Sequence, residues 1–223
     1  MEYLYPAVCW LRHWLLEINE HSLHSPFLFN LYTRVFSKAR THPGEERLET
    51  IRKNLKKSRN KLSPGSLGAG TRLPGRQRTL GRIVRHGITP KKYSLLYREL
   101  IRYFDLRHIL ELGTSIGLNT LYLAGSSTRA RVWTFEGDPD LLRVSKELFR
   151  DHPAKHIETI EGDIGTTLPA FLDSHPSPDF ILFDANHTLE ATWKYYCLVK
   201  KKLPETAILV FDDIYWSKDM TRA

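Results

Sequence analysis

The chain of 223 residues contains only two cysteines and no long apolar run. Cys9 and Cys197 lie far apart, which favours free thiols in a reducing compartment over a disulfide framework. A helix that crosses a membrane needs about 20 consecutive apolar residues, and the N-terminus lacks the basic start and apolar core of a signal peptide. These absences predict a cytoplasmic protein with no membrane partner.

The sequence also lacks the motifs of several enzyme classes. It has no Walker loop for phosphates and no G-x-S-x-G turn for a serine nucleophile. Its histidines and cysteines do not follow the spacing of zinc ligands, so no zinc site is expected.

Charge is plentiful but unevenly distributed. Residues 1–106 hold 20 Lys and Arg against 8 Asp and Glu, whereas residues 107–223 hold 13 against 17. Opposite net charges in two parts of a chain indicate different roles. The N-terminal part is therefore expected to attract an anionic partner, and the C-terminal part to gather carboxylates around a site.

Residues 1–80 are predicted to form a basic helical extension. Apolar residues recur at helical spacing from Val8 to Ile18, Ser25-Pro26 is a typical start for a helix to about Lys38, and a charged helix is expected over residues 45–57. Residues 58–81 are rich in Gly, Ser, Pro and Arg, which predicts a linker or lid. A second domain is then expected over residues 81–223, with a helix over residues 91–104.

From Arg107 onward, short apolar segments alternate with helical ones. Strands are expected over residues 108–112, 131–136, 157–161, 180–184 and 207–211, and helices over residues 118–124, 139–152, 165–174 and 189–203. This alternation predicts an α/β fold with a doubly wound, mostly parallel sheet covered by helices on both faces.

Carboxylates gather at the ends of these strands. They are Glu111, Glu136, Asp163, Asp184, Asp212 and Asp213. A solvated surface would scatter acidic residues along helices, and ligands of such sheets bind at the carboxyl ends of the strands. The coincidence predicts a binding site at this edge.

The turn after the first strand contains Gly113 and Gly117. Their spacing is G-x-x-x-G, so the G-x-G-x-x-G fingerprint of dinucleotide folds is incomplete. Glycine permits close approach of a ligand, and the start of the next helix offers free N–H groups to an anion. Glu136 ends the second strand, where a carboxylate can accept both hydroxyls of a ribose. Together these features predict a nucleoside site.

Five segments in order resemble the motifs of class I S-adenosylmethionine-dependent methyltransferases. They are Glu111-Leu-Gly-Thr-Ser-Ile-Gly117, Glu136-Gly-Asp-Pro139, Glu161-Gly-Asp163, Phe183-Asp184 and Phe211-Asp-Asp213. The set is most similar to the small-molecule O-methyltransferases typified by catechol O-methyltransferase. The opening His24-Ser-Pro-Phe27 and the basic helical stretch also resemble an uncharacterised bacterial methyltransferase group. The motifs lie within residues 92–217 and are specific to the superfamily, not to a substrate.

The resemblance implies a Rossmann-like methyltransferase fold that binds S-adenosyl-L-methionine. The methionine and ribose end of the cofactor would be framed by Glu111, Gly113, Thr114, Ser115 and Gly117. By the same resemblance, Asn119 would lie near the methionine carboxylate, and Glu136 would hold the ribose hydroxyls. Asp163 and Ile164 would face the adenine, although Asp163 also suits a plain turn before Gly165.

Asp184, Asp212 and Asp213 follow neighbouring strands, which lie about 4.8 Å apart. Their hard oxygen ligands suit Mg²⁺ or another divalent cation. The arrangement is similar to that of the metal-dependent O-methyltransferases, except that Asp213 stands where the family has Asn. In the alternative interpretation, Asp212 or Asp213 caps the next segment and binds no ion.

His187 and Asp184 are the candidate catalytic residues. His187 lies three residues after Asp184, where the catechol enzyme places a lysine near the substrate hydroxyl. A histidine there could act as a general base near neutral pH, or it could simply hydrogen-bond the backbone at a helix start. A metal on Asp184 would lower the pKa of a bound hydroxyl.

The predicted function is O-methylation of a small hydroxylated molecule, with metal assistance. Two alternatives stay open: methylation of RNA or another polyanion through the basic N-terminal region, and a non-catalytic cofactor-binding module. The sheet of the family continues past its fifth strand with a helix and a hairpin, and the chain ends about ten residues after Asp213. The fifth strand is thus expected to be an open edge, which a second subunit could cover in a homodimer.

Overall fold

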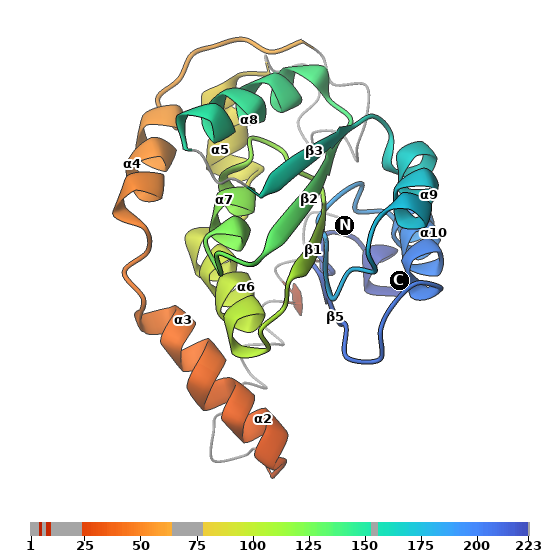
Figure 1. The fold of residues 1–223 in the computed structure, drawn as a ribbon. Helices are drawn as coiled ribbons and strands as arrows, with labels where there is room; N and C mark the ends of the chain where they lie inside the picture. Colours follow the sequence, from red (N-terminus) through yellow and green to blue (C-terminus); the bar gives the residue numbers. More distant parts are fainter. Residues whose placement is uncertain (1–4, 6–7, 10–23, 64–77, 153–155, 223) are drawn as a thin grey trace.

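The structure is a computed structural model that describes residues 5, 8–9, 24–63, 78–152 and 156–222. A parallel sheet forms the centre, and helices cover both of its faces (Figure 1). The predicted helix from Val8 to Ile18 and most of the predicted linker fall outside the described residues. No helix in the described part of the chain is long and apolar enough to cross a membrane.

The five strands follow the order β3-β2-β1-β4-β5, and every neighbouring pair is parallel. The strands are β1 (His108–Leu112), β2 (Arg131–Glu136), β3 (Ile157–Glu161), β4 (Phe180–Phe183) and β5 (Ile208–Phe211). In the register, Leu112 of β1 lies between Phe135 of β2 and Phe183 of β4. The order reverses at β1, so the loops after β1 and β4 diverge there, which is where ligands of doubly wound sheets bind.

Each face of the sheet packs against its own set of helices. Leu110, Leu112 and Phe135 point to one face, against α9 (Ile164–Ser174) and α10 (Leu189–Lys200). Ile109 and Val132 alternate with them and point to the other face. That face is covered by α6 (Lys91–Tyr103), α7 (Leu118–Ala124) and α8 (Pro139–Asp151). Successive side chains of a strand point to opposite faces, so strands with apolar residues at successive positions need cover on both sides.

The N-terminal helices run along and beyond the α6 side of the domain (Figure 1). One helical path comprises α2 (Pro26–Leu31), a π-helical turn η3 (Tyr32–Phe36) and α3 (Ser37–Thr41). Ser25 caps it and Pro26 occupies its first turn, as the sequence predicts. Lys38 forms an ion pair of 2.8 Å with Glu99, which attaches α3 to α6. Then follow α4 (Glu46–Leu55) and, near the other end of the chain, a 3-10 turn η4 (Met220–Arg222).

A helix that the sequence does not indicate, α5 (Leu80–His86), begins where the predicted linker ends. Lys61 and Thr79 form an antiparallel bridge just before it. Gly81 then packs so closely that a Cβ there would collide with the carbonyl oxygens of Lys56 and Ser58. These contacts hold α5 against the chain that follows α4.

Candidate active site

A cleft of about 810 Å³ opens at the carboxyl ends of all five strands. Its floor consists of the loops that follow β1, β2, β3, β4 and β5, and residues 78–90 with Tyr93 form its opposite wall. The predicted binding edge is therefore a real depression. Of the predicted site residues, Gly113, Thr114, Ser115, Asn119, Glu136, Asp163, Ile164, Asp184, His187, Asp212 and Asp213 line it.

The loop after β1 requires glycine at two positions. Gly113 has φ +113°, and a Cβ there would overlap the backbone oxygen of Asp184. Gly117 has φ +81°, and its Cβ would lie 2.6 Å from the Phe149 ring. Glycine adopts these angles without the steric cost that other residues meet. The loop can therefore pass close to β4 and to α8, which brings its backbone to the edge of the cleft.

Glu111 lies beneath the cleft and does not line it. Its side chain is fully buried and accepts hydrogen bonds from Asn119 Nδ2 (2.8 Å), Thr120 Oγ1 (2.5 Å) and Thr134 Oγ1 (2.7 Å). Burial raises the pKa of Glu111 to about 7, against the lowering effect of these donors. In this structure Glu111 orients Asn119 and is not among the residues that line the cleft, so its contact with the cofactor stays a prediction.

Asn119 lines the cleft and carries a buried acceptor atom. Its Nδ2 group donates to Glu111, and its Oδ1 atom is buried without a hydrogen-bond partner in the described part of the chain. A buried polar atom without a partner costs free energy unless a ligand or water satisfies it. Oδ1 can accept a hydrogen bond and cannot donate one, so it suits an ammonium group. The placement of Asn119 near the methionine carboxylate stays a prediction.

Glu136 is held rigidly at the end of β2. Its Oε1 atom accepts from the backbone N–H of Asp138 (2.9 Å), and its Oε2 atom accepts from that of Ser115 (2.7 Å). Burial raises the pKa of the Glu136 carboxyl, and these N–H donors oppose the rise. Each carboxylate oxygen keeps a further lone pair for a hydroxyl. The two backbone donors therefore fix the carboxylate where it can meet a ligand.

The loop after β3 brings Asp163 and Ile164 to the same cleft. Asp163 precedes α9 at the N-cap position, and its Oδ1 atom accepts from Thr166 Oγ1 at 3.2 Å. Ile164 is almost fully buried. The turn interpretation and the cleft interpretation of Asp163 thus describe one geometry.

The other end of the cleft is acidic. Asp184, Asp212 and Asp213 lie around His187, whose Nε2 atom is 3.9 Å from Asp184 Oδ1 and 3.7 Å from Asp213 Oδ2. The ring of Trp216 lies 5.7 Å from the His187 ring. Burial raises the pKa of Asp184 well above its usual value, and the neighbouring Asp212 and Asp213 raise it further.

Two residues that the sequence does not point to hold these carboxylates in place. Thr89 Oγ1 donates to Asp184 Oδ2 at 3.0 Å, and the Tyr97 hydroxyl donates to Asp212 Oδ2 at 3.0 Å. Burial and the neighbouring Asp212 raise the pKa of Tyr97 above its usual range. Tyr97 belongs to α6, and Thr89 lies two residues before the start of that helix. The segment that precedes β1 therefore orients the carboxylates at the acidic end of the cleft.

The carboxylates are not arranged as a metal cage. Among the residues that the structure describes, no three His, Cys, Asp or Glu side chains converge closely enough to hold an ion. Asp212 already accepts from Tyr97 and, through Oδ1, from the backbone N–H of Asp213 at 2.8 Å. A metal would require these carboxylates to move closer together than they lie in this structure.

Backbone strain gathers in this cleft. Across the described residues, five non-glycine residues have positive φ, and four of them line the cleft: Ser115, Asn186, His187 and Asp213. Such conformations cost on the order of 1–3 kcal/mol each and persist where the surrounding structure enforces them, often at functional sites. The strain therefore agrees with the cleft as the functional site.

The fold is a doubly wound α/β domain with a cleft at the carboxyl ends of its strands. Residues 110–214, from within β1 to just beyond β5, match the family model of a methyltransferase domain. No curated protein sequence matched the chain. Several solved structures share its fold.

Methyltransferase PaMTH1 from Podospora anserina, with S-adenosylhomocysteine bound, superposes with a TM-score of 0.60 at 19% identity, over 86% of this chain and 74% of that one. O-methyltransferase TomG from Streptomyces achromogenes, in complex with S-adenosylmethionine, gives 0.58 at 18% identity, over 82% and 71%. A protein from Staphylococcus aureus provisionally identified as a caffeoyl-CoA O-methyltransferase gives 0.55 at 22% identity, over 60% of this chain. The match spans 63% of the length of that Staphylococcus protein.

Residues 110–214 therefore match a methyltransferase domain, in agreement with the motifs, and the solved structures share the α/β fold of the chain. The expected α/β fold with a helical N-terminal region is confirmed.

Proposed function

We propose that the chain transfers the methyl group of S-adenosylmethionine to an oxygen of a small hydroxylated molecule. The observation that carries this proposal is the composition of the cleft: one end has the features of a nucleoside site, and the other end places a histidine between carboxylates. The names of two structural neighbours, an O-methyltransferase in complex with S-adenosylmethionine and a provisional caffeoyl-CoA O-methyltransferase, agree with it.

In this proposal the adenosine lies across the ends of β2 and β3. Glu136 accepts the ribose hydroxyls, because its carboxylate is already fixed by two backbone N–H groups. Asp163 and Ile164 lie against the adenine, Asp163 as an acceptor for its amino group and Ile164 as an apolar surface. Asn119 Oδ1 accepts from the ammonium group of the methionine end, which satisfies its buried oxygen.

The acceptor hydroxyl lies at the acidic end, beside His187. The imidazole takes the hydroxyl proton, and the electron pair of the oxygen forms the new C–O bond as the C–S bond breaks. The sulfur keeps the electron pair of that bond and leaves as S-adenosylhomocysteine. The imidazolium that forms lies within 4 Å of Asp184 and Asp213, and their charge stabilises it. The rest of catalysis is alignment of donor and acceptor.

The proposal routes no step through a metal. The oxygen chemistry of Asp184, Asp212 and Asp213 suits Mg²⁺, but their present hydrogen bonds do not present three ligands to one ion. Dependence of transfer on Mg²⁺, measured with EDTA-treated protein, decides whether the carboxylates rearrange to bind it.

Calorimetric titration with S-adenosylmethionine tests the cofactor site. Glu136→Gln is expected to weaken binding by about 10- to 100-fold, because it removes charge-assisted hydrogen bonds to the ribose. Glu161→Gln is the matched control: Glu161 pairs with Glu136 in the β2–β3 register, but its side chain is exposed and paired with Lys146. The affinity of the Glu161→Gln variant for S-adenosylmethionine should stay within about twofold of that of the wild type. Absence of binding to the wild-type chain would refute the proposed function.

A further inference from the structure

The cationic side chains of the cleft all come from one wall. Its acidic residues belong to the strand ends, whereas its arginines are Arg78, Arg82 and Arg85, in and just before α5. A cleft with one basic and one acidic wall discriminates between ligands by charge. The question is which of these arginines has a charge available for a ligand.

Two of the three arginines already bind other groups of the protein. Arg78 forms an ion pair of 2.7 Å with Asp138 and donates to the Ser63 carbonyl. Arg85 donates through Nε and Nη2 to the carbonyl oxygen of Lys56, at 3.0 and 2.6 Å. Arg82 is partly buried and lines the cleft, and its guanidinium has neither an ion pair nor a hydrogen bond within the described ranges of the chain.

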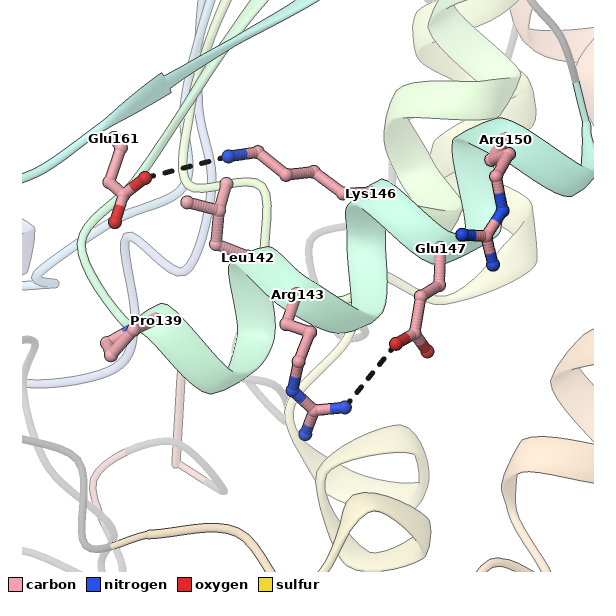
Figure 2. Close-up of a pocket in the computed structure, with 7 residues that line it drawn as sticks. All are labelled: Pro139, Leu142, Arg143, Lys146, Glu147, Arg150 and Glu161. Carbon is pink, nitrogen blue, oxygen red and sulfur yellow. Dashed lines mark ion pairs between the residues drawn. The ribbon is translucent and has the colours of Figure 1, made fainter.

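A second basic depression provides a contrast. On α8, Arg143, Lys146 and Arg150 line a shallow hollow together with Glu147 and Glu161 (Figure 2). Arg143 lies 3.5 Å from Glu147, and Lys146 lies 3.6 Å from Glu161. These cations are exposed and already paired, so this hollow offers little charge to an anion. Arg82 differs because it is partly buried and forms no ion pair with any carboxylate of the described residues.

The contacts at the two ends of the wall place Arg82 between the nucleoside end and the acceptor end. Arg78 is paired with Asp138, directly after the ribose-binding turn of Glu136. Thr89, on the far side of α5, donates to Asp184 at the acidic end. Arg82 lies between Arg78 and Thr89 in the sequence and lines the same cleft, so we infer that it faces the region between the two ends, where the proposed cofactor would have its amino-acid group.

The side of the cleft opposite Arg82 offers no partner that we have identified for the carboxylate of the proposed cofactor. Asn119 Oδ1 is an acceptor and suits only the ammonium group of that amino acid. We propose that Arg82 binds a carboxylate in the cleft, that of the methionine end of S-adenosylmethionine. This inference rests on the proposed function. A guanidinium presents parallel donors that match a carboxylate in a bidentate pair.

The test compares two ligands that differ in the amino-acid group. S-adenosylhomocysteine carries it, and 5′-methylthioadenosine has the same adenosine and thioether without it. Arg82→Gln is expected to weaken S-adenosylhomocysteine by about 10- to 100-fold in calorimetry and to leave 5′-methylthioadenosine within twofold. Arg82→Lys should lie between, because it keeps the charge and loses the fork. Arg143→Gln, which makes the same change of charge at a paired position, should alter neither affinity.

A carboxylate on the methyl acceptor is the other source of the same chemistry. With S-adenosylhomocysteine saturating, binding of 3,4-dihydroxybenzoate is compared with that of catechol in the wild type and in Arg82→Gln. Loss of a preference for the benzoate, with cofactor affinity unchanged, would assign Arg82 to the acceptor.

The proposal is overturned, while the proposed function stands, if the Arg82→Gln protein melts like the wild type and keeps both affinity ratios. These are the ratio of S-adenosylhomocysteine to 5′-methylthioadenosine and the ratio of 3,4-dihydroxybenzoate to catechol. A wild-type chain that binds neither adenosine ligand overturns both.

Discussion

Glu111 couples the stability of the fold to pH, because it is an acidic residue near the end of β1 whose side chain is completely buried. Its pKa is raised from 4.5 to about 7, so the folded chain keeps the Glu111 proton to a higher pH than the unfolded chain does. The stabilisation that Glu111 contributes is fully present below the pKa that it has in the unfolded chain. It is lost as the pH rises through the pKa that Glu111 has in the folded chain.

We expect Glu111 to lower the stability of the wild type by about 3 kcal/mol between pH 4.5 and 7. Urea unfolding at several pH values measures it, with Glu111→Gln as the variant that cannot titrate. The difference in free energy of unfolding between the two proteins should change with pH in that window and be constant outside it. A constant difference from pH 4 to 8 would contradict the shift.

Gly113 is the residue whose replacement should cost most in the cofactor loop. Gly113→Ala places a side chain at φ +113° and drives its Cβ into the Asp184 carbonyl oxygen. Strain and overpacking together should destabilise the chain by about 2–4 kcal/mol. Gly165→Ala is the control, because its Cβ meets the movable end of Lys194 and lies within helix α9. Chemical denaturation should place that control within about 1 kcal/mol of the wild type.

At the scale of elements, the strands were predictable because each is a short segment rich in apolar residues that is followed by a glycine or an aspartate. β1, β2 and β3 match their predicted ranges, and β4 and β5 differ by one residue at one end. Helix α5 was not predicted because Gly81 and a run of basic residues give residues 80–86 the composition of a linker. Its helicity depends on packing against residues 56–58, which local sequence does not encode.

The candidate site was predictable where it follows strand ends and not where it depends on distant partners. Strand periodicity places Glu136, Asp184 and Asp212 at the cleft. The hydrogen bonds from Thr89 to Asp184 and from Tyr97 to Asp212 join residues 95 and 115 positions apart, so no local pattern signals them. Glu111 marks the limit of the resemblance, because a motif fixes a position in the chain but not whether its carboxylate faces the ligand or the core.

At the scale of the whole molecule, one apolar cluster joins the N-terminal region to the methyltransferase domain. Ala39 of α3, Leu48 of α4 and Leu62 pack in the same cluster as Leu118 and Tyr122 of α7. The Lys38–Glu99 ion pair adds a contact in which Glu99 is almost fully buried. The boundary predicted near residue 80 stays a prediction, but the described residues on either side of it share a core.

A shared core predicts that the described helices and the sheet unfold together. Calorimetry should therefore record one transition, and S-adenosylhomocysteine should move all of it, because a ligand that binds only the folded state stabilises everything that unfolds with its site. At a free concentration 100 times the dissociation constant, the gain is about 2.7 kcal/mol, or roughly 5–10 °C for a chain of this size. Arg82→Gln or Glu136→Gln should reduce this shift of the melting temperature at equal ligand concentration. Two transitions, of which only one responds to the ligand, would show that the N-terminal helices fold as a separate unit and contribute to the cleft only by docking.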